Sequence, residues 1–454
     1  MGVEMKKIEF LDAVKCIQKE EVLTIEQRDK NRQERLEELV KYTAENSPYF
    51  KKIYASLGEN FKLQDIPKTN KKALQPEFDN WVTDSQISKD KIYEFQTNQS
   101  EDNNLFLNKY TVITTSGTTG EPMLMVRDSY HNVIHGALMQ ERLLKGVSPN
   151  LLRPVDNKIA AVIATEGTVS SYSSLVRVMK QYPEYAHNIC PISIMLPINE
   201  IVSKLNKFKP NMLSGYPSML TVLATEQLNG NLNISPELIA CSAETLSKDA
   251  YLLLKDAFKC KVINNYCSTE GGEIAMTCEC GELHINDDWI IVEAVDENLM
   301  EVPDGEISKG VLVTDLTNYA QPIIRYYVDD NVKIIREKCK CGSTFPRIEV
   351  LGRVSDTLNI CGVNIPSVIF AYLMHDYSEV LSFQFAQISC DTIEFRCVLH
   401  KDADIDDFRK RLEKDIDEIY RKNNCKEAKF IFTQKTPKNT GKGGKLKTVL
   451  NELK

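Results

Sequence analysis

The chain has 454 residues, of which 42% are apolar and 26% charged, as in ordinary globular proteins of two or three domains. Its net charge of −8 gives no general positive field, so we expect neither nucleic acid nor an anionic membrane as a partner. No apolar run approaches the ~20 residues of a membrane helix, and the first residues lack an apolar signal core. We therefore expect a cytoplasmic protein whose thirteen cysteines are reduced or bind metal.

The N-terminal third is predicted to be mainly helical. An apolar stripe between charged residues predicts helix within residues 23–57, and residues 66–102 have the polar pattern of a surface region with short helices. A strand over residues 110–114 is expected to end in a glycine-rich turn. A long helical pattern then follows Asp128 as far as residue 145.

The middle of the chain alternates between strand and helix patterns. Residues 158–165 form a continuous apolar run typical of a buried parallel strand. Helical and strand-like stretches follow in alternation at residues 197–207, 211–214, 217–227, 238–242, 248–258 and 261–266. This alternation predicts an α/β fold. Residues 283–335 are strand-rich, with a hairpin-like turn region at 296–306.

The pattern changes again after Arg353. A charged amphipathic helix over residues 402–422 and strands near 393–398 and 428–432 predict a small α+β unit. We therefore predict a large layered α/β domain over residues 1–353 and a small C-terminal domain over residues 354–454. His131, His135 and His187 are interpreted as ordinary core or surface residues.

Residues 114–122 read TTSGTTGEP, in which hydroxyl side chains and two glycines can turn N–H and O–H groups towards a polyphosphate. This is not a Walker loop, because no Gly-Lys-Ser/Thr follows. The segment resembles the nucleotide-phosphate loop of the adenylate-forming superfamily, which includes acyl-CoA synthetases. The resemblance assigns the phosphate-binding role to Thr115, Ser116, Gly117, Thr118, Thr119 and Gly120.

Further segments of the same superfamily follow in its order. YCSTE at 266–270 resembles its Tyr-Gly-x-Thr-Glu segment, with Cys267 in place of the glycine. The resemblance implies that Tyr266 stacks on adenine, Thr269 binds the α-phosphate and Glu270 holds Mg²⁺. A tyrosine ring suits a base, and a carboxylate suits Mg²⁺. The segment that resembles the lining of the adenine pocket is Ser242, Ala243 and Glu244.

RYYVDD at 325–330 resembles the segment in which an aspartate binds both ribose hydroxyls. Asp330 fits that spacing, with Asp329 as its competitor. Gly352-Arg353 then resembles the start of the domain hinge, where Arg353 would bind ribose or phosphate. The chain has Ser355 where the family often has aspartate, which weakens the match at the hinge.

The last segment, PKNTGKGGKLK at 437–447, resembles the C-terminal loop that brings a lysine to the reacting carboxylate and α-phosphate. Lys442 fits the distance from Pro437, whereas Lys445 fits the local Gly-Lys-x-Lys pattern better and is preferred. Without this resemblance, the segment would read as a solvated basic tail.

The segment at 35–54 and the Gly-x-Leu-His-Ile segment at 281–285 are similar to the phenylacetate–CoA ligase-like, or CapK-like, branch. The branch implies a mobile C-terminal lid, and activation by ATP and Mg²⁺ of a small carboxylic acid, aromatic or arylacetic, with transfer to coenzyme A. Transfer to a carrier-protein pantetheine or an amine is the alternative, and a zinc-stabilised nucleotide-binding protein without activity is a lesser one. A dimer is compatible with the sequence.

Two Cys-x-Cys-Gly segments lie about sixty residues apart and contribute Cys278, Cys280, Cys339 and Cys341. A glycine after the second cysteine lets backbone N–H groups face the sulfurs, and four thiolates suit a structural Zn²⁺. His284 is a fifth candidate ligand, so four of five residues would bind. The resemblance makes Cys280 the weakest of the five, because some relatives of the branch keep a Cys, this His and the later Cys pair.

Overall fold

The computed structural model describes residues 6–453 apart from short gaps. The residues outside the description are 59, 98–104, 115–122, 146, 148–150, 152–154, 156, 164–174, 177–178, 181, 194–195, 197, 242–245, 247, 354–356, 367–369, 371–372, 375–376, 378, 400–402, 423–424, 426 and 438–448. No helix among the described residues is long and apolar enough to cross a bilayer.

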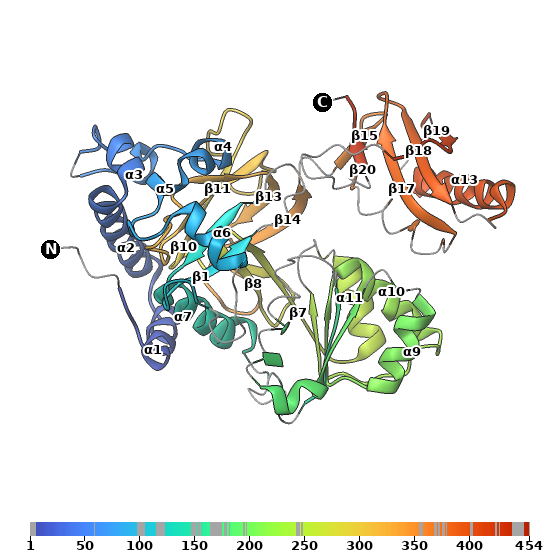
Figure 1. The fold of residues 1–454 in the computed structure, drawn as a ribbon, viewed down its shortest axis with the longest axis horizontal. Coiled ribbons are helices and arrows are strands. Elements are labelled where there is room, and N and C mark those ends of the chain that lie inside the picture. The colour runs from blue at the N-terminus through green and yellow to red at the C-terminus, as the bar shows by residue number, and fades with distance from the viewer. Residues whose placement is uncertain are drawn as a thin grey trace.

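A nine-stranded sheet with the order β13-β14-β9-β8-β7-β6-β5-β3-β4 runs through the larger part of the molecule (Figure 1). Its strands are β3 (Ile159–Ile163), β4 (Ile189–Ser193), β5 (Met212–Gly215), β6 (Leu238–Cys241), β7 (Lys261–Ser268), β8 (Gly272–Thr277), β9 (Leu283–Ile285), β13 (Asp330–Ile335) and β14 (Arg347–Arg353). Strands β3 to β7 are parallel, and the other four join in antiparallel pairs. The predicted alternation of strands and helices is therefore confirmed.

Three helices pack on the parallel half of the sheet: α9 (Ile198–Phe208), α10 (Pro217–Leu228) and α11 (Lys248–Phe258). Helix α9 buries Ile201, Val202 and Leu205, which lie on one face by their spacing. With apolar residues of β3, β5 and β6 they form one hydrophobic core. Each parallel strand thus ends at the same edge of a rigid layer.

The N-terminal helices belong to a second, larger core. They include α1 (Phe10–Glu21), α2 (Ile25–Asn46), α3 (Pro48–Ile53), α4 (Lys71–Leu74), α5 (Phe78–Trp81), α6 (Lys89–Thr97) and α7 (Ser129–Leu138). They pack with the hairpin β1 (Thr111–Thr114)–β2 (Leu124–Arg127) and the sheet β10 (Ile290–Val295)–β11 (Gly310–Asp315)–β12 (Tyr326–Val328). Thr24 and Gln27 form a capping box that starts α2. Helix α1 lies where no element was predicted.

The C-terminal residues form a third core. Strands β17 (Val380–Gln387), β18 (Thr392–Leu399), β19 (Lys429–Thr433) and β20 (Val449–Asn451) pair in one sheet, against which α13 (Ile405–Lys422) packs. The hairpin β15 (Thr357–Ile360)–β16 (Val363–Pro366) turns at Cys361 and Gly362, both at positive φ, as a two-residue turn requires. The predicted elements of this unit are present, and the domain boundary itself remains a prediction.

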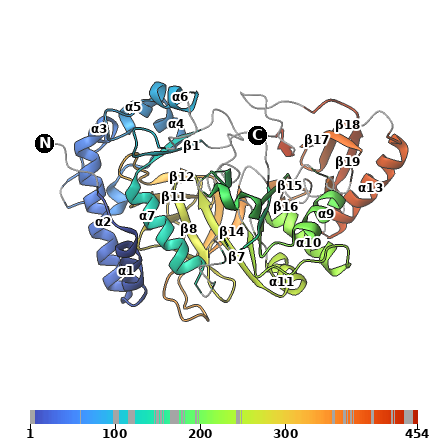
Figure 2. The same ribbon diagram turned by 60° about the horizontal axis from the view of Figure 1, so that its bottom comes forward.

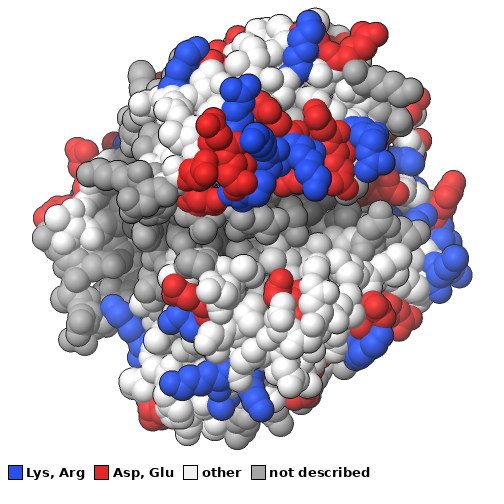
Figure 3. Space-filling view, turned by 90° about the vertical axis from the view of Figure 1, so that its right-hand side faces the viewer, with Lys and Arg blue, Asp and Glu red and all other residues white. Residues whose placement is uncertain are grey.

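The N-terminal helices and the C-terminal part lie at opposite ends of the molecule in both ribbon views (Figures 1 and 2). The end of the molecule that carries α13 presents lysine, arginine, aspartate and glutamate side chains side by side in its upper part (Figure 3). Opposite charges also pair along α13, where Arg409–Glu413 and Arg411–Asp407 join residues four apart.

Candidate active site and cysteine–histidine cluster

Part of the predicted nucleotide site lies outside the described residues. These residues are Thr115, Ser116, Gly117, Thr118, Thr119, Gly120, Ser242, Ala243, Glu244, Lys442 and Lys445. The strands that flank the first two segments are described. β1 and β2 pair around residues 115–122, and β6 ends at Cys241, directly before Ser242. The roles of these residues therefore remain predictions.

Three other predicted residues meet near the end of β7. Tyr266 is buried, and its Oη donates a hydrogen bond to Asp330 Oδ2 at 2.6 Å. Asp330 is the first residue of β13, and its register partner is Arg353, the last residue of β14. The backbone position of Arg353 is described, but its side chain is not. The structure thus brings the predicted adenine and ribose residues together.

This meeting requires the sheet to curl. β7 and β13 are separated by β8, β9 and β14, so four strand spacings of about 4.8 Å would hold them roughly 19 Å apart in a flat sheet. The Tyr266 and Asp330 side chains are together shorter than that distance, yet their ends meet at 2.6 Å. The antiparallel half of the sheet therefore bends β13 towards β7.

Thr269 and Glu270 occupy the turn between β7 and β8, and both are half-buried. Arg127 donates from Nη2 to the Thr269 carbonyl oxygen at 2.8 Å, and the Gly271 N–H donates to Ser268 Oγ at 2.8 Å. Burial lowers the pKa of Arg127, and nearby carboxylates, Glu270 among them, oppose that effect. The turn is thus held by a half-buried arginine that was not predicted from the sequence.

Two histidines on one face of α7 form a second group that was not predicted. His131 Nδ1 lies 2.9 Å from Thr317 Oγ and 2.9 Å from Asp315 Oδ2, and His135 Nε2 lies 3.2 Å from Thr317 Oγ. Burial lowers the pKa of His131 to about 3. Burial alone would raise the pKa of Asp315, but the two histidines hold it well below its usual range. No local pattern reveals this group, because its halves lie over 170 residues apart.

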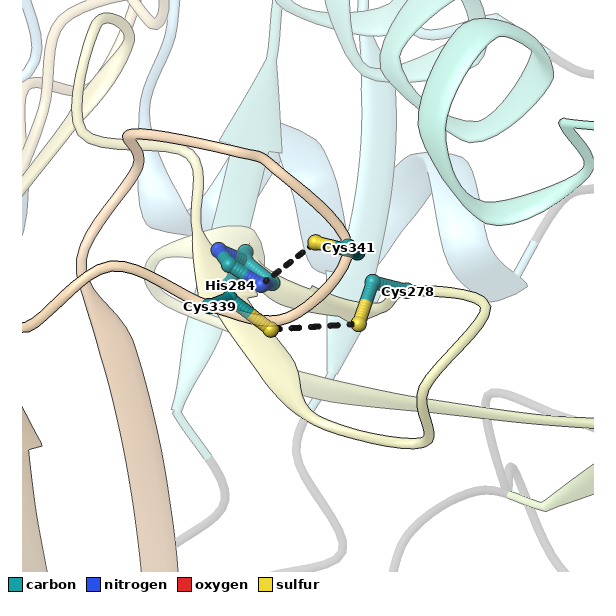
Figure 4. A group of neighbouring side chains, drawn as sticks. All are labelled: Cys278, His284, Cys339 and Cys341. Atoms are coloured by element: carbon teal, nitrogen blue, oxygen red, sulfur yellow. Dashed lines mark hydrogen bonds between the residues drawn. The ribbon is translucent and has the colours of Figure 1, made fainter.

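Four of the five predicted metal ligands come together. The ligand atoms of Cys278, His284, Cys339 and Cys341 all lie within 4.8 Å of one another. Figure 4 shows Cys278 facing Cys339 and Cys341 facing His284, with Sγ–Sγ and Sγ–Nε2 distances of 4.0 and 3.6 Å. Cys280 is exposed and lies outside this group.

The spacings fit a tetrahedral metal. With Zn–S bonds of ~2.3 Å and Zn–N bonds of ~2.0 Å, two sulfurs lie about 3.8 Å apart and a sulfur and a nitrogen about 3.5 Å apart. Gly281 and Gly342 both have positive φ, which turns the chain after each Cys-x-Cys. Backbone N–H groups of Cys341 and Ser343 then face the sulfurs of Cys339 and Cys341. Burial raises the pKa of Cys341 to about 12, an effect that a bound cation would reverse.

The histidine ligand is held by its other ring nitrogen. His284 Nδ1 donates to the Phe345 carbonyl oxygen at 2.8 Å, which leaves Nε2 to face the cysteines. The Phe345 ring lies between two guanidinium groups, with Arg28 Cζ at 4.2 Å and Arg142 Cζ at 4.3 Å from its centre. Arg28 also donates to the Thr344 hydroxyl and carbonyl oxygens. Helix α2 thus supports the second half of the cluster.

Comparison with known proteins agrees with this geometry. No protein-family model matches the chain. It is 28% identical to protein CapK of Staphylococcus aureus over 265 residues, which are 56% of this chain and 55% of that protein. It is 25% identical to phenylacetate-coenzyme A ligase of Thermus thermophilus over 361 residues, 75% of this chain and 74% of that protein. The chain is a homologue of these two proteins.

The fold also resembles that of a solved ligase structure. A solved structure of 2-hydroxyisobutyryl-CoA ligase is 17% identical and matches with a TM-score of 0.63 over 95% of this chain and 91% of that chain. The resemblance to the CapK-like and phenylacetate–CoA ligase-like branch and the expected α/β fold class are therefore confirmed. The chain spans about half the length of CapK, so its activity and substrates are matters of proposal.

Tyr266→Phe tests the bond between the adenine and ribose residues. The change removes one buried hydrogen bond to a carboxylate, and we expect the free energy of unfolding to fall by about 1.5–3 kcal/mol. Tyr327→Phe is the control, because Tyr327 Oη makes an exposed bond to the Lys309 carbonyl and only a long contact of 3.5 Å to Asp329, which together should contribute less than about 0.5 kcal/mol. Urea unfolding measures both. An equal loss of unfolding free energy in the two variants would show that the Tyr266–Asp330 bond contributes no more than an exposed one.

His131→Asn is expected to reduce the loss of stability in acid. In the unfolded chain the His131 ring takes up a proton near pH 6.5. In the folded chain, burial keeps the same ring neutral until the pH falls to about 3. Acid between these values therefore favours the unfolded state, and stability falls as the pH falls. Asparagine takes up no proton, and its Nδ2 can still donate to Asp315.

Urea unfolding between pH 7 and pH 4.5 measures this effect. The fall in unfolding free energy should be shallower for His131→Asn than for the unmodified chain, by up to about 1.4 kcal/mol per pH unit. His187→Asn, at an exposed position, is the matched control and should not alter the slope. The same slope in all three proteins would show that His131 is not the acid-sensitive group.

Proposed function

We propose that the chain is an AMP-forming acid–thiol ligase of the cytoplasm. With Mg·ATP it would convert a small carboxylic acid into an acyl-adenylate and pyrophosphate, and would then transfer the acyl group to coenzyme A. The observation that carries this proposal is the Tyr266–Asp330 contact beside the Thr269–Glu270 turn. Homology to phenylacetate-coenzyme A ligase supports the reaction type.

In the first step a carboxylate oxygen attacks the α-phosphorus, and pyrophosphate leaves. Two anions meet, so the protein must supply positive charge and N–H dipoles. Glu270 would bind the Mg²⁺ that accompanies ATP, and Thr269 would bind the α-phosphate. Lys445, with Lys442 as the alternative, would bring an ammonium to the reacting groups. Tyr266, Asp330 and Arg353 would hold the adenosine.

In the second step the thiol sulfur attacks the acyl carbon, and AMP leaves. The mixed anhydride is already activated, so positioning of the thiol suffices and no side chain becomes a covalent nucleophile. Residues 354–454 would act as a mobile lid that presents first the lysine and then the thiol channel. The separate hydrophobic core of the C-terminal part supports a unit that moves as one body.

The substrate class follows from the relatives. The Thermus relative is named for phenylacetate, so aromatic and arylacetic acids are the first choice here. Coenzyme A is the expected acceptor, with a carrier-protein pantetheine or an amine as the alternative. A nucleotide-binding protein without activity is the lesser alternative, which the test below separates.

We further propose that Cys278, His284, Cys339 and Cys341 hold a structural Zn²⁺. The thiol and imidazole donors suit zinc, and the 4.0 and 3.6 Å spacings support a tetrahedral site. All four positions would be filled by protein, which leaves no open site for a substrate. Zinc would therefore crosslink the ends of β8 and β9 to the segment before β14, and would take no part in the chemistry.

Pyrophosphate release tests the ligase proposal. The chain is incubated with Mg·ATP and a panel of aryl, arylacetic and short aliphatic acids, each with and without coenzyme A. We expect release that depends on an aryl or arylacetic acid and turns over only with coenzyme A. Release that stalls near one equivalent in both conditions would indicate a different acceptor. ATP binding without release from any acid would contradict the proposal and favour the protein without activity.

The same assay separates the two lysines. Loss of the positive charge that acts in the transition state should lower the kcat of adenylation by about 10²–10³-fold. We expect this loss for Lys445→Ala and a much smaller effect for Lys442→Ala. The opposite order would assign the reaction to Lys442, and no loss in either would contradict a lysine from this loop.

Metal analysis tests the zinc proposal. We expect about one zinc ion per chain, lost in Cys341→Ser and retained in the matched variant Cys280→Ser, because only Cys341 belongs to the close group. A strong chelator should lower the melting temperature, and added Zn²⁺ should restore it. Equal loss of zinc in the two variants would contradict the set of four ligands.

A further inference from the structure

The turn that carries Thr269 and Glu270 receives a third support from α7. Arg127 donates to the Thr269 carbonyl, and Ser268 accepts from the Gly271 N–H. In addition, the Glu273 N–H donates to His135 Nδ1 at 3.0 Å. His135 lies more than 130 residues earlier in the chain and is buried. Arg127 contacts the backbone one residue before Glu270, and His135 contacts it three residues after Glu270.

The hydrogen-bond pattern defines the state of the His135 ring. A backbone N–H can only donate, so His135 Nδ1 must carry a lone pair and the neutral ring carries its proton on Nε2. That proton points to Thr317 Oγ at 3.2 Å, and the Thr317 hydroxyl donates in turn to Asp315 Oδ1 at 2.5 Å. In this series of hydrogen bonds, the Glu273 N–H, the His135 Nε2–H and the Thr317 hydroxyl each have one acceptor. A protonated His135 would lose the bond to Glu273.

Gly272 shows that the turn and the ring are fitted to each other. It has a φ of +63°, and a Cβ built on it would lie only 2.3 Å from His135 Cε1. The imidazole thus occupies the space that any larger residue at 272 would need. The first residue of β8 rests directly on the ring.

The ligand atoms of His131, His135 and Asp315 are close enough to hold a metal ion, but the Thr317 hydroxyl lies among them. Thr317 Oγ lies 2.9 Å from His131 Nδ1, 3.2 Å from His135 Nε2 and 2.5 Å from Asp315 Oδ1. The hydroxyl therefore fills the point at which an ion would meet these three ligands. Its short contacts are those of hydrogen bonds, so the group is a rigid support beneath the turn.

We propose that His135 is a positioning residue for the proposed adenylation step. As a neutral acceptor it fixes the Glu273 N–H, and so the backbone of residues 269–273, with Thr269 and Glu270 in register for phosphate and Mg²⁺. Thr317 and Asp315 fix the ring in turn. The effect of His135 on the rate of adenylation rests on the proposed function. Its effect on the backbone of residues 269–273 does not.

Two substitutions separate the two ring nitrogens. His135→Asn places an oxygen close to the position of Nδ1, so it keeps an acceptor for the Glu273 N–H and loses the reach to Thr317. His135→Gln keeps a donor near the position of Nε2 and loses that acceptor. Both are neutral and polar, which makes each the matched control for the other. His187→Gln controls for a change at an exposed histidine.

Hydrogen exchange and steady-state kinetics are measured on the full chain, purified without chelator. In His135→Gln the peptide over residues 269–277 should exchange faster, and kcat should fall by up to about a hundredfold with little change in the KM of the acid. In His135→Asn the exchange should resemble that of the unmodified chain and most of kcat should remain. Equal exchange and equal kcat in the two variants would overturn the proposal.

The outcomes separate this inference from the ligase proposal. If the unmodified chain activates no acid, the ligase proposal fails, and the exchange contrast still decides whether His135 fixes the turn. If His135→Gln does not fold, Thr317→Val takes its place, because it removes only the hydroxyl between the ring and Asp315. Faster exchange over residues 269–277 in Thr317→Val would support the inference, and unchanged exchange and kcat would overturn it.

Discussion

The structure depends on one short strand, β8, which connects the two sites. Its first residue, Gly272, ends the turn that carries Glu270, and its last residue, Thr277, directly precedes Cys278 of the cysteine–histidine cluster. An extended strand of six residues transmits a displacement at one end to the other, because its backbone is bonded on both edges to β7 and β9. Fixing Cys278 therefore limits where Glu270 can lie.

The N-terminal helices complete this restraint from outside the sheet. Arg28 on α2 and Arg142, just after α7, hold Phe345 between them, and Phe345 holds His284. Arg142 is itself anchored by two bonds to the buried carboxylate of Asp288. A charged helix layer thus stabilises the cluster through stacking and paired charges, which are effective because they are shielded from water.

The sequence predicts the elements with strong periodicity and the residues with local signatures. The buried run at 158–165 and the amphipathic α9 are found because their patterns are local. Helix α1 is missed although half of its residues are apolar, and two of these, Phe10 and Leu11, stay exposed in the fold. The group formed by His131, His135, Asp315 and Thr317 is missed because residues such as His135 and Thr317 meet only in the folded chain. Local spacing alone does not say which cysteine is left out, since Cys280 has the same signature as Cys341, and only the resemblance to the branch marked Cys280 as the weakest candidate.

Charge balance explains why a neutral histidine lies beneath the turn. Arg127 already supplies one half-buried positive charge there, and Asp315 supplies a negative one that accepts hydrogen bonds from the Thr317 N–H and hydroxyl and lies 2.9 Å from His131 Nδ1. A second cation at His135 would repel Arg127 and would also give up the only lone pair that can accept from Glu273 N–H. The neutral ring avoids both costs. Glu270 then lies in the field of Arg127, and its carboxylate would bind the Mg²⁺ that the proposed reaction requires.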